Sequence, residues 1–365
     1  MNAEKKALMI ERITEQIAKI DNKDFTFYFY IPDTKGNATG SLSYIYDIAF
    51  GLNEMGYKVG MLHSEEEFVG VGDWMGEKYA ELSHYNIERH KIDVSPSDFI
   101  FIPEIYTNVM TATRNLPCQR IGILQSFDKL TELIPFGAGW GDLGIFKAIT
   151  TTNANASRLN TYFPYVKTNV ITPKISNAFS NTGELKKLIV NIVTREQSDI
   201  SKIVKPFFWQ YPMYQWVAFR ELRGLSREQM AQSLQEAAIT VWVDDCTDFG
   251  YTPLEAMKCG SIVVGRVPDA APEWMMNDDN TLTNAGIWVD NISSIPSVLA
   301  SVIRTWTMDA IPPEIQMEAD KVTSYYTEGA QLQDIKTVCI DGLVAERRQE
   351  FVTTLEELNN SENEE

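Results

Sequence analysis

The residues with the clearest chemical potential lie between Asp244 and Gly265, in the stretch DDCTDFGYTPLEAMKCGSIVVG. The pattern predicts a strand end, a turn, a short helix that Gly260 terminates, and a second buried strand. Thr252, Pro253 and Glu255 match a helix start with Thr as N-cap, Pro at the first helical position and Glu at the third. In this interpretation Glu255 belongs to a capping box and has a structural role.

The same carboxylate is also a candidate ligand for a nucleotide. Gly250 and Tyr251 end a loop that follows a predicted strand, at the carboxyl edge of a parallel sheet, where open α/β sheets bind ligands. Backbone N–H groups at the start of the next helix favour a phosphate. A carboxylate can accept hydrogen bonds from the two vicinal hydroxyls of a ribose. The order of residue types therefore indicates a nucleotide site with Glu255 on the ribose.

Apolar strands alternate with helical segments from residue 25 onward, which predicts parallel α/β sheets connected by right-handed crossovers. A polar, turn-rich stretch at about 170–187 interrupts the alternation and predicts a domain junction. Each half resembles a doubly wound sheet, so the expected fold class is α/β with two Rossmann-like domains. We predict strands at 25–31, 57–63, 98–106, 120–126, 186–194, 214–222, 239–245, 261–265 and 286–290, with helices at 42–56, 206–212 and 226–237. The stretch 148–163 is expected to be a strand that leads into a helix.

The charge balance is strongly acidic. The 365 residues include 32 Lys and Arg against 50 Asp and Glu, which gives a formal net charge of −18. This charge disfavours a broad surface for nucleic acid or anionic membrane, which would need clustered Lys and Arg. The N-terminal stretch MNAEKKALMIERITEQIAKI has no long apolar core, so we expect neither a signal peptide nor stable membrane insertion, and a cytoplasmic protein.

Isoleucines at helical spacing in that stretch predict an amphipathic helix over 1–24. The helix packs on its own domain or on a second subunit, so a homodimer is left open. The acidic residues on its polar face disfavour membrane docking, the third alternative.

Cysteines and histidines are few, and their spacing does not predict a metal site. The four cysteines contain no CxxC pair and the three histidines no ligand spacing, so we expect reduced, mostly buried thiols and no metal ion. The acidic pairs at 244–245 and 278–279 are adjacent residues rather than a DxD arrangement.

The stretch DFGYTPLEAMKCGSIVVG, residues 248–265, resembles the signature of retaining glycosyltransferases of family 4, which have the two-domain GT-B fold. That family carries two glutamates separated by seven residues. Glu255 matches the second, which the resemblance implies holds the ribose of the donor. Thr247 occupies the position of the first, which contacts donor-sugar hydroxyls, and Asp248 lies beside it. The residues between them complete the implied donor site: Phe249, Gly250, Tyr251 and Thr252.

Two further segments resemble the same family. LIVNIVTREQSDISK is similar to the strand that precedes an Arg and a Lys on the donor diphosphate, with Arg195 as the arginine and Lys202, or alternatively Lys205, as the lysine. The diphosphate leaving group carries negative charge, which cations such as these or a metal ion must stabilise. The glycine-rich loop before residue 42 implies that Gly40 and Ser41 line the cleft facing the donor phosphates.

Strand ends in the first half supply candidates for the acceptor side. Glu104 follows the predicted strand at 98–106, with a buried structural role as the alternative. Gln125 and Ser126 are similar candidates at the end of the strand at 120–126.

Residue patterns and the resemblance together predict five parts along the chain. They are an N-terminal amphipathic helix (1–24), an acceptor domain (25–175), a nucleotide-sugar-binding domain (185–325), C-terminal helices returning to the first domain (326–355) and an acidic tail expected to be disordered (356–365).

The leading functional hypothesis is a metal-independent glycosyltransferase that moves a sugar from a UDP- or GDP-sugar to a carbohydrate or other hydroxyl acceptor, with retention. Chemistry is expected in the interdomain cleft, with the leaving diphosphate assisting deprotonation of the acceptor. One alternative is a GT-B-like binding or regulatory protein that has lost transfer, because Thr247 replaces a glutamate. Another alternative keeps the chemistry with a modified base in viral DNA as acceptor, which the acidic charge disfavours.

Overall fold

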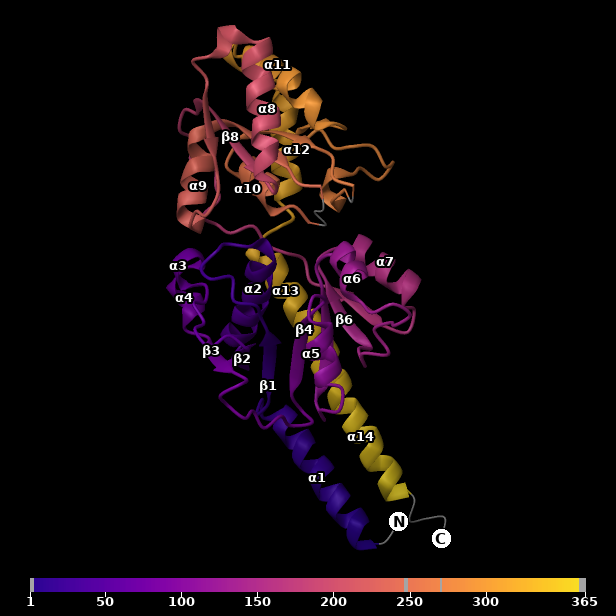
Figure 1. The fold of residues 1–365 in the computed structure, drawn as a ribbon. Coiled ribbons are helices and arrows are strands. Elements are labelled where there is room, and N and C mark those ends of the chain that lie inside the picture. Colours follow the sequence, from indigo (N-terminus) through magenta and orange to yellow (C-terminus); the bar gives the residue numbers. More distant parts are fainter. Residues whose placement is uncertain (1–2, 246–248, 270, 361–365) are drawn as a thin grey trace. The chain divides into compact units, whose positions relative to one another are not determined.

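The computed structural model describes residues 3–245, 249–269 and 271–360, and the chain divides into two compact units (Figure 1). Unit 1 holds the N-terminal segment through Gly72, the segment Gly76–Thr172 and the C-terminal segment from Gln331. Unit 2 holds Pro173–Ala330 together with Asp73–Met75. No helix in the described part of the chain combines the length and the apolar character needed to cross a bilayer.

Unit 1 is built on a seven-stranded sheet in the order β3-β2-β1-β4-β5-β6-β7. Its strands are β1 (Thr26–Tyr30), β2 (Lys58–His63), β3 (Ser83–Asn86), β4 (Phe99–Pro103), β5 (Gln119–Leu124), β6 (Lys147–Thr150) and β7 (Lys167–Val170). Its helical elements are α1 (Ala3–Asp21), α2 (Gly40–Glu54), α4 (Glu77–Ala80), α5 (Thr107–Ala112), α6 (Phe127–Leu133), α7 (Asn153–Tyr162), the π-helix η4 (Lys336–Val344) and α14 (Ala345–Asn360). The short α3 (Gly72–Met75) and the longer α13 (Glu328–Ile335) each include residues of both units.

Unit 2 is built on a five-stranded sheet in the order β12-β11-β10-β8-β9. Its strands are β8 (Lys187–Thr194), β9 (Ala218–Glu221), β10 (Ala237–Val243), β11 (Ile262–Arg266) and β12 (Ile287–Val289). Its helices are α8 (Gln197–Gln210), α9 (Arg227–Glu236), α10 (Tyr251–Lys258), α11 (Ile295–Thr307) and α12 (Pro313–Thr323), with short 3-10 turns η1 (Pro212–Tyr214), η2 (Glu273–Met275) and η3 (Ile292–Ser294).

Every strand pair within both sheets is parallel. In each sheet the order reverses once, between β1 and β4 in unit 1 and between β8 and β10 in unit 2. Such a reversal is a topological switch point, and open α/β sheets bind ligands outside the carboxyl ends of the strands at that point. The topology therefore identifies one edge of each sheet as its functional edge.

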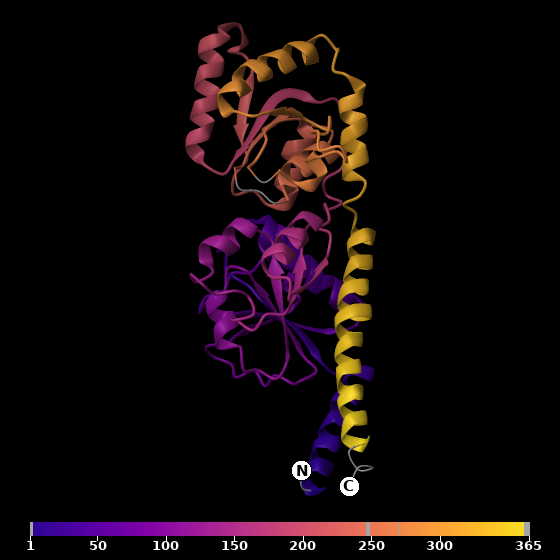
Figure 2. The same ribbon diagram turned by 90° about the vertical axis from the view of Figure 1, so that its right-hand side faces the viewer.

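The sheet of unit 2 is buried on both faces by separate apolar clusters. Trp242 and Val263 pack with residues of α9, α10 and α12, whereas the neighbouring Val241 and Val264 pack with residues of α8 and α11. This alternation follows from the period of two along a strand. Figure 2 shows helices on both sides of this sheet. Burial of both faces explains why these strands are almost continuously apolar in sequence.

Stacked aromatic rings form part of the core of unit 1. Phe27 stacks on Phe99 with ring centroids 5.1 Å apart, and Phe29 stacks on Phe101 at 4.6 Å. These pairs come from β1 and β4, the two strands at the switch point, and all four rings are fully buried. Such contacts stabilise the strand pairing by about 0.5–1.5 kcal/mol per pair beyond area burial.

The predicted α/β class with two Rossmann-like sheets is confirmed, and each predicted strand overlaps a strand of the structure. Two edge strands, β3 and β7, were not predicted, because their sequences SHYN and KTNV carry few apolar residues. The expected disordered tail at 356–365 is wrong for residues 356–360, which continue α14, where Leu358 is partly buried. Residues 361–365 lie outside the described chain.

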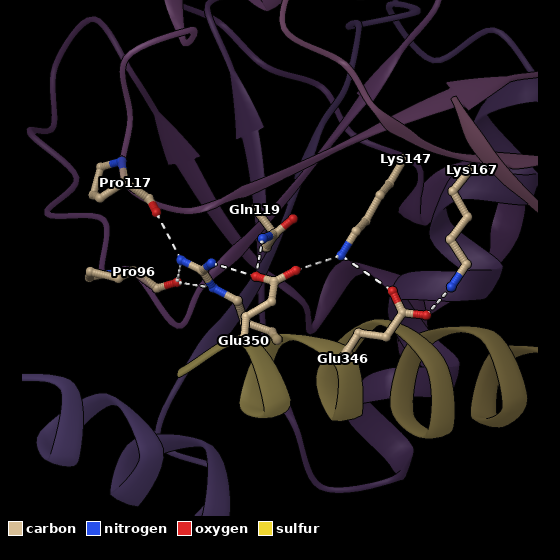
Figure 3. Close-up of polar contacts among 8 residues, drawn as sticks. Pro96, Pro117, Gln119, Lys147, Lys167, Glu346 and Glu350 are labelled. Atoms are coloured by element: carbon tan, nitrogen blue, oxygen red, sulfur yellow. Dashed lines mark hydrogen bonds and ion pairs between the residues drawn. The ribbon is translucent and has the colours of Figure 1, made fainter. Parts of the chain in front are cut away.

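Two glutamates of α14 bind the β5, β6 and β7 strands of unit 1 (Figure 3). Glu346 lies 3.4 Å from Lys147 and also pairs with Lys167. Glu350 lies 3.2 Å from the same Lys147 and accepts a 2.9 Å hydrogen bond from Gln119. Burial opposes ionisation of both carboxyls, but Lys167 and Lys147 keep the pKa of Glu346 below its usual range, and Arg347 and Lys147 do the same for the pKa of Glu350. These contacts attach the C-terminal helix to the first sheet.

Arg347 makes the most buried of these polar contacts. It donates hydrogen bonds of 2.9–3.0 Å to the carbonyl of Pro96 and one of 3.3 Å to the carbonyl of Pro117 (Figure 3). Its guanidinium lies 2.7 Å from Glu350 and 4.3 Å from the centre of the Phe351 ring. One side chain thus satisfies carbonyls from two loops that have no strand partner there.

We expect Arg347→Ala to lower the free energy of unfolding by about 2–4 kcal/mol, because it removes the donor of the Pro96 and Pro117 carbonyls and one cation beside Glu350. Arg348→Ala is the matched control, since Arg348 is 44 % exposed and pairs only with Asp21, whereas Arg347 is 15 % exposed. The control should lose less than about 1 kcal/mol. Urea denaturation followed by circular dichroism measures both, and equal losses would contradict the prediction.

Candidate functional site

Helix α10 begins two residues earlier than the sequence predicts. Its N-cap is Gly250, with φ 72° and ψ 71°, and no side chain caps it. Thr252 is therefore the second helical residue and Glu255 the fifth, so the predicted capping box is wrong. The left-handed conformation of Gly250 turns the chain directly into the helix. Pro253 is tolerated at the third position because its missing N–H would have no helical partner there.

The turn before α10 is fixed by buried aromatic residues. Phe249 is buried, and its carbonyl accepts a 2.6 Å hydrogen bond from the indole of Trp274. The Phe249 ring packs edge-on against Tyr251 and Tyr326, at centroid distances of 4.7 and 5.3 Å. These contacts of Phe249 hold the turn in place. Gly250, the N-cap of α10, has no side chain that could accept a hydrogen bond from the first turn of the helix.

The end of α10 is as predicted, with Gly260 just beyond the helix at φ 79°. The N–H of Gly260 bonds the carbonyl of Met257 and that of Ser261 bonds the carbonyl of Ala256, which is a Schellman motif. Lys186 donates to the carbonyl of Cys259 and to the carbonyls of Leu234 and Gln235 in the last turn of α9. Carbonyl groups in the last turns of α9 and α10 thus have hydrogen-bond donors.

Glu255 lies in the second turn of α10 and is partly buried. Its carboxylate has no hydrogen bond to any group of the described chain. Burial raises the pKa of Glu255 to about 7, and the opposing attraction of Arg227 at the start of α9 is smaller. A carboxylate without donors in such a place is costly, and hydroxyl donors of a ligand would relieve that cost.

Arg195 and Asp244 meet at the switch point of unit 2. Arg195 directly follows β8 and Asp244 directly follows β10, and Arg195 Nε lies 3.3 Å from the Asp244 carboxylate. The backbone N–H of Arg195 also bonds the carbonyl of Val243. The predicted phosphate-binding arginine is thus at the expected edge, and an acid from the neighbouring strand already contacts it.

Lys202 lies on α8, where its ammonium contacts the Asp199 carboxylate at 2.6 Å. This hydrogen bond and the negative charges of Asp199, Asp245 and Glu196 raise the pKa of Lys202. The effect of Asp245 indicates that Lys202 faces the carboxyl edge of β10. The side chain is 59 % exposed, so it can reach a ligand there. Lys205, the alternative, is exposed and forms no ion pair with another residue of the described chain.

A second arginine, Arg266, was not predicted. It ends β11 and pairs with Asp245, the residue after Asp244, and with Asp269 at 3.0 Å. Two adjacent aspartates after β10 therefore hold one arginine from each neighbouring strand. The adjacent Asp244 and Asp245 are the feature of the sequence that could have indicated two arginine partners. The described chain contains no group of three or more His, Cys, Asp or Glu side chains suited to a metal ion.

Thr247 and Asp248, the predicted contacts to a donor sugar, lie outside the described residues. The rest of the predicted donor constellation in unit 2 lies on the elements around β8 and β10: Arg195, Lys202, Phe249, Gly250, Tyr251, Thr252 and Glu255.

The candidates of unit 1 gather at the carboxyl edge of its own sheet. Gly40 and Ser41 are the first residues of α2, which Thr39 caps. The Gln125 amide donates a 3.1 Å hydrogen bond to the Ser41 carbonyl. Glu104 is buried after β4 and accepts a 3.0 Å hydrogen bond from the backbone N–H of Ser126, the N-cap of α6. Glu104 therefore makes a buried structural contact, in agreement with the alternative to an acceptor-side role.

Comparisons with known proteins support the fold. No family model and no curated protein sequence matches the chain. Among solved structures, a sucrose-phosphate synthase from Thermosynechococcus elongatus superposes with a TM-score of 0.61 at 12% identity, covering 88% of this chain and 99% of that one. Anabaena HepE, solved in complex with UDP-glucose, gives 0.61 at 12% identity over 86% and 99%. The catalytic domain of starch synthase IV from Arabidopsis thaliana gives 0.54 at 10% over 89% and 99%. The chain thus has the GT-B fold, and its structural neighbours are glycosyltransferases.

The raised pKa of Glu255 predicts a stability change with pH. The pKa of Glu255 is about 7 in the folded chain, against an ordinary glutamate value of 4.5, so the protonated carboxyl favours folding. This contribution is fully present below the unfolded pKa and is lost as pH rises through about 7. Glu255→Gln should therefore gain about 2 kcal/mol of unfolding free energy relative to wild type between about pH 5.5 and about pH 8.

Denaturant unfolding at the two pH values measures this difference. Glu314→Gln, at an exposed glutamate on α12, is the control and should track wild type. A constant difference between Glu255→Gln and wild type would show that burial does not act on this carboxylate.

Proposed function

We propose that the protein is a glycosyltransferase that moves a sugar from a nucleotide-sugar donor to an acceptor hydroxyl. The observation that carries the proposal is the partly buried Glu255 carboxylate, which lacks a hydrogen bond within the described chain. It lies on α10, which follows β10 at the switch point. Two vicinal ribose hydroxyls would supply the missing donors. The complex of its neighbour HepE with UDP-glucose supports the donor class.

In this proposal the diphosphate binds the first turn of α10 together with Arg195 and Lys202. The N–H groups of that turn and the helix dipole favour a negative group. The two cations stabilise the charge that develops as the bond between the sugar and the diphosphate breaks, so no metal is needed. Gly40 and Ser41 at the start of α2 are proposed to face the phosphates from unit 1.

We further propose transfer with retention, as in the family 4 enzymes that the sequence resembles. The anomeric carbon leaves the diphosphate oxygen and bonds the acceptor oxygen on the same face, and the acceptor proton passes to the leaving phosphate. Thr247 and Asp248 are proposed to contact the donor sugar, and Glu104 the acceptor side, at the end of β4. The donor is a UDP- or GDP-sugar.

A second candidate, a GT-B-like binding protein without transfer, is favoured by the charges at the edge of unit 2. Three cations there, Arg195, Lys202 and Arg266, face five carboxylates, those of Glu196, Asp199, Asp244, Asp245 and Asp269. Such an excess weakens the attraction for a diphosphate. Nucleotide binding without turnover of any donor would establish this alternative.

Glu255→Ala should weaken UDP or GDP binding by about 100-fold, because two charge-assisted hydrogen bonds to the ribose are lost. Isothermal titration calorimetry measures this, with Glu314→Ala as the control on an exposed helix position. The melting temperature of Glu255→Ala should not fall through loss of a cap, since Glu255 does not cap α10. Equal affinities of Glu255→Ala and wild type would refute the ribose role, and no binding to wild type would refute the proposed function.

Asp244→Asn should tighten UDP binding by about tenfold, because it removes a negative charge that competes with the diphosphate for Arg195. Uridine, which has no phosphate, should bind the variant and wild type equally. The difference for UDP should shrink at high ionic strength. Weaker UDP binding by the variant would instead mean that Asp244 holds Arg195 in the geometry that the phosphate needs.

A further inference from the structure

His63 is a buried imidazole at the functional edge of unit 1. It is the last residue of β2, and it pairs in register with Asn86, the last residue of β3. Only 6 % of the residue is exposed. The ring of Phe68 stacks on the imidazole at a centroid distance of 4.2 Å and an angle of 24°. The position is thus one at which parallel sheets bind ligands, and the ring is held by packing.

Local hydrogen bonds determine the tautomer of His63. Its Nδ1 lies 3.1 Å from the carbonyl oxygen of Glu65, and because a carbonyl can only accept, Nδ1 carries the hydrogen. The same carbonyl accepts a 2.8 Å hydrogen bond from the Asn86 amide. The Glu65 carboxylate lies 4.0 Å from Nδ1 and accepts a hydrogen bond from the Ser64 N–H. In the neutral ring Nε2 therefore holds a lone pair.

Nε2 has no hydrogen-bond partner in the described chain. Nε2 is not one of the fully buried polar atoms that lack a partner, so a ligand can reach it although most of the ring is covered. The other two histidines differ. Nε2 of His84 lies 2.8 Å from the Tyr46 hydroxyl, and burial lowers the pKa of His84. His90 is exposed.

We propose that His63 Nε2 accepts a hydrogen bond from a hydroxyl of a carbohydrate-like ligand at the carboxyl edge of unit 1. The partly exposed Glu65 carboxylate is a second acceptor beside it. Two acceptors without a donor suit a group with several O–H donors, such as a pair of sugar hydroxyls. The fixed tautomer and the stacked Phe68 orient Nε2 before the ligand arrives, which lowers the entropy cost of binding.

This subsite is continuous with the edge that holds Glu104. The charge of Glu65 contributes to the raised pKa of Tyr106, so Glu65 lies within electrostatic reach of the segment that follows β4. Tyr106 packs edge-on against Tyr30 at the end of β1, with centroids 4.6 Å apart. Identification of the ligand as the glycosyl acceptor rests on the proposed function, whereas the hydroxyl site itself rests on the geometry of unit 1.

The chain contains only three histidines, so selective ¹⁵N-histidine labelling resolves the site by NMR. The full-length protein is titrated with methyl α-glucoside, methyl α-mannoside and N-acetylglucosamine. We expect a saturable shift of the His63 Nε2 resonance with at least one sugar, while His84 and His90 stay in place. Absence of a His63 shift with all three sugars would overturn the proposal. Glucosamine is titrated as a fourth probe, and a shift with it alone would overturn the proposal too, because the ligand would then be an ammonium group.

Two variants separate the two ring nitrogens. His63→Asn keeps an N–H near the position of Nδ1 and removes Nε2, whereas His63→Gln places an amide near Nε2. We expect His63→Asn to lose sugar binding in isothermal titration calorimetry and at least about tenfold in transfer to a sugar acceptor, and His63→Gln to retain part of both. His90→Gln is the control and should behave as wild type. Equal behaviour of His63→Asn and wild type would overturn the assignment.

Failure of this inference is distinguishable from failure of the proposed function. UDP binding and its loss in Glu255→Ala depend on unit 2 and should be unchanged in His63→Asn. Donor binding with no role for His63 would reject only the acceptor subsite. A sugar response at His63 without any nucleotide binding would reject only the glycosyltransferase proposal.

Discussion

Parallel strand pairing is the constraint on which the candidate sites depend. When all strands of a sheet point the same way, the residues that follow them meet at one edge. In unit 2 this pairing places Arg195 beside Asp244, although forty-nine positions separate them in the chain. In unit 1 it places His63 beside Asn86 in the same way. Burial of both faces of the unit 2 sheet leaves the edges as the places where its polar side chains collect.

The acidic residues of unit 2 differ in whether a cation of the protein balances their charge. Asp244 and Asp245 each contact an arginine, so their charges are compensated within the protein. Glu255 has no such contact in the described chain, and burial raises its pKa to about 7. A buried acid without a donor lowers stability in the free protein, and that cost is recovered only when a ligand supplies donors. Ligand binding and stability are therefore expected to compete at this residue.

The local start of α10 shows how far sequence rules reach. The residues Thr252, Pro253 and Glu255 satisfy the capping-box pattern, yet the helix begins at Tyr251 after Gly250. The rule failed because a glycine in the left-handed conformation, with the buried Phe249 carbonyl bonded to Trp274, starts the helix earlier. The bond from Trp274 comes from a distant segment that local patterns do not report. The stop at Gly260 was predictable, because a Schellman motif depends only on adjacent residues.

The sequence alone determined the α/β class, the main strands and the strand ends that carry Arg195, Glu104 and Glu255, because periodicity and residue order are local properties. Only the tertiary structure decided which strand ends are neighbours. It thereby paired Arg195 with Asp244 and Arg266 with Asp245, gave Glu104 a structural contact with Ser126, and left Nε2 of His63 without a partner in the described chain. Ion pairs and burial depend on contacts between residues far apart in sequence, and the strand order of the two sheets brings those residues together.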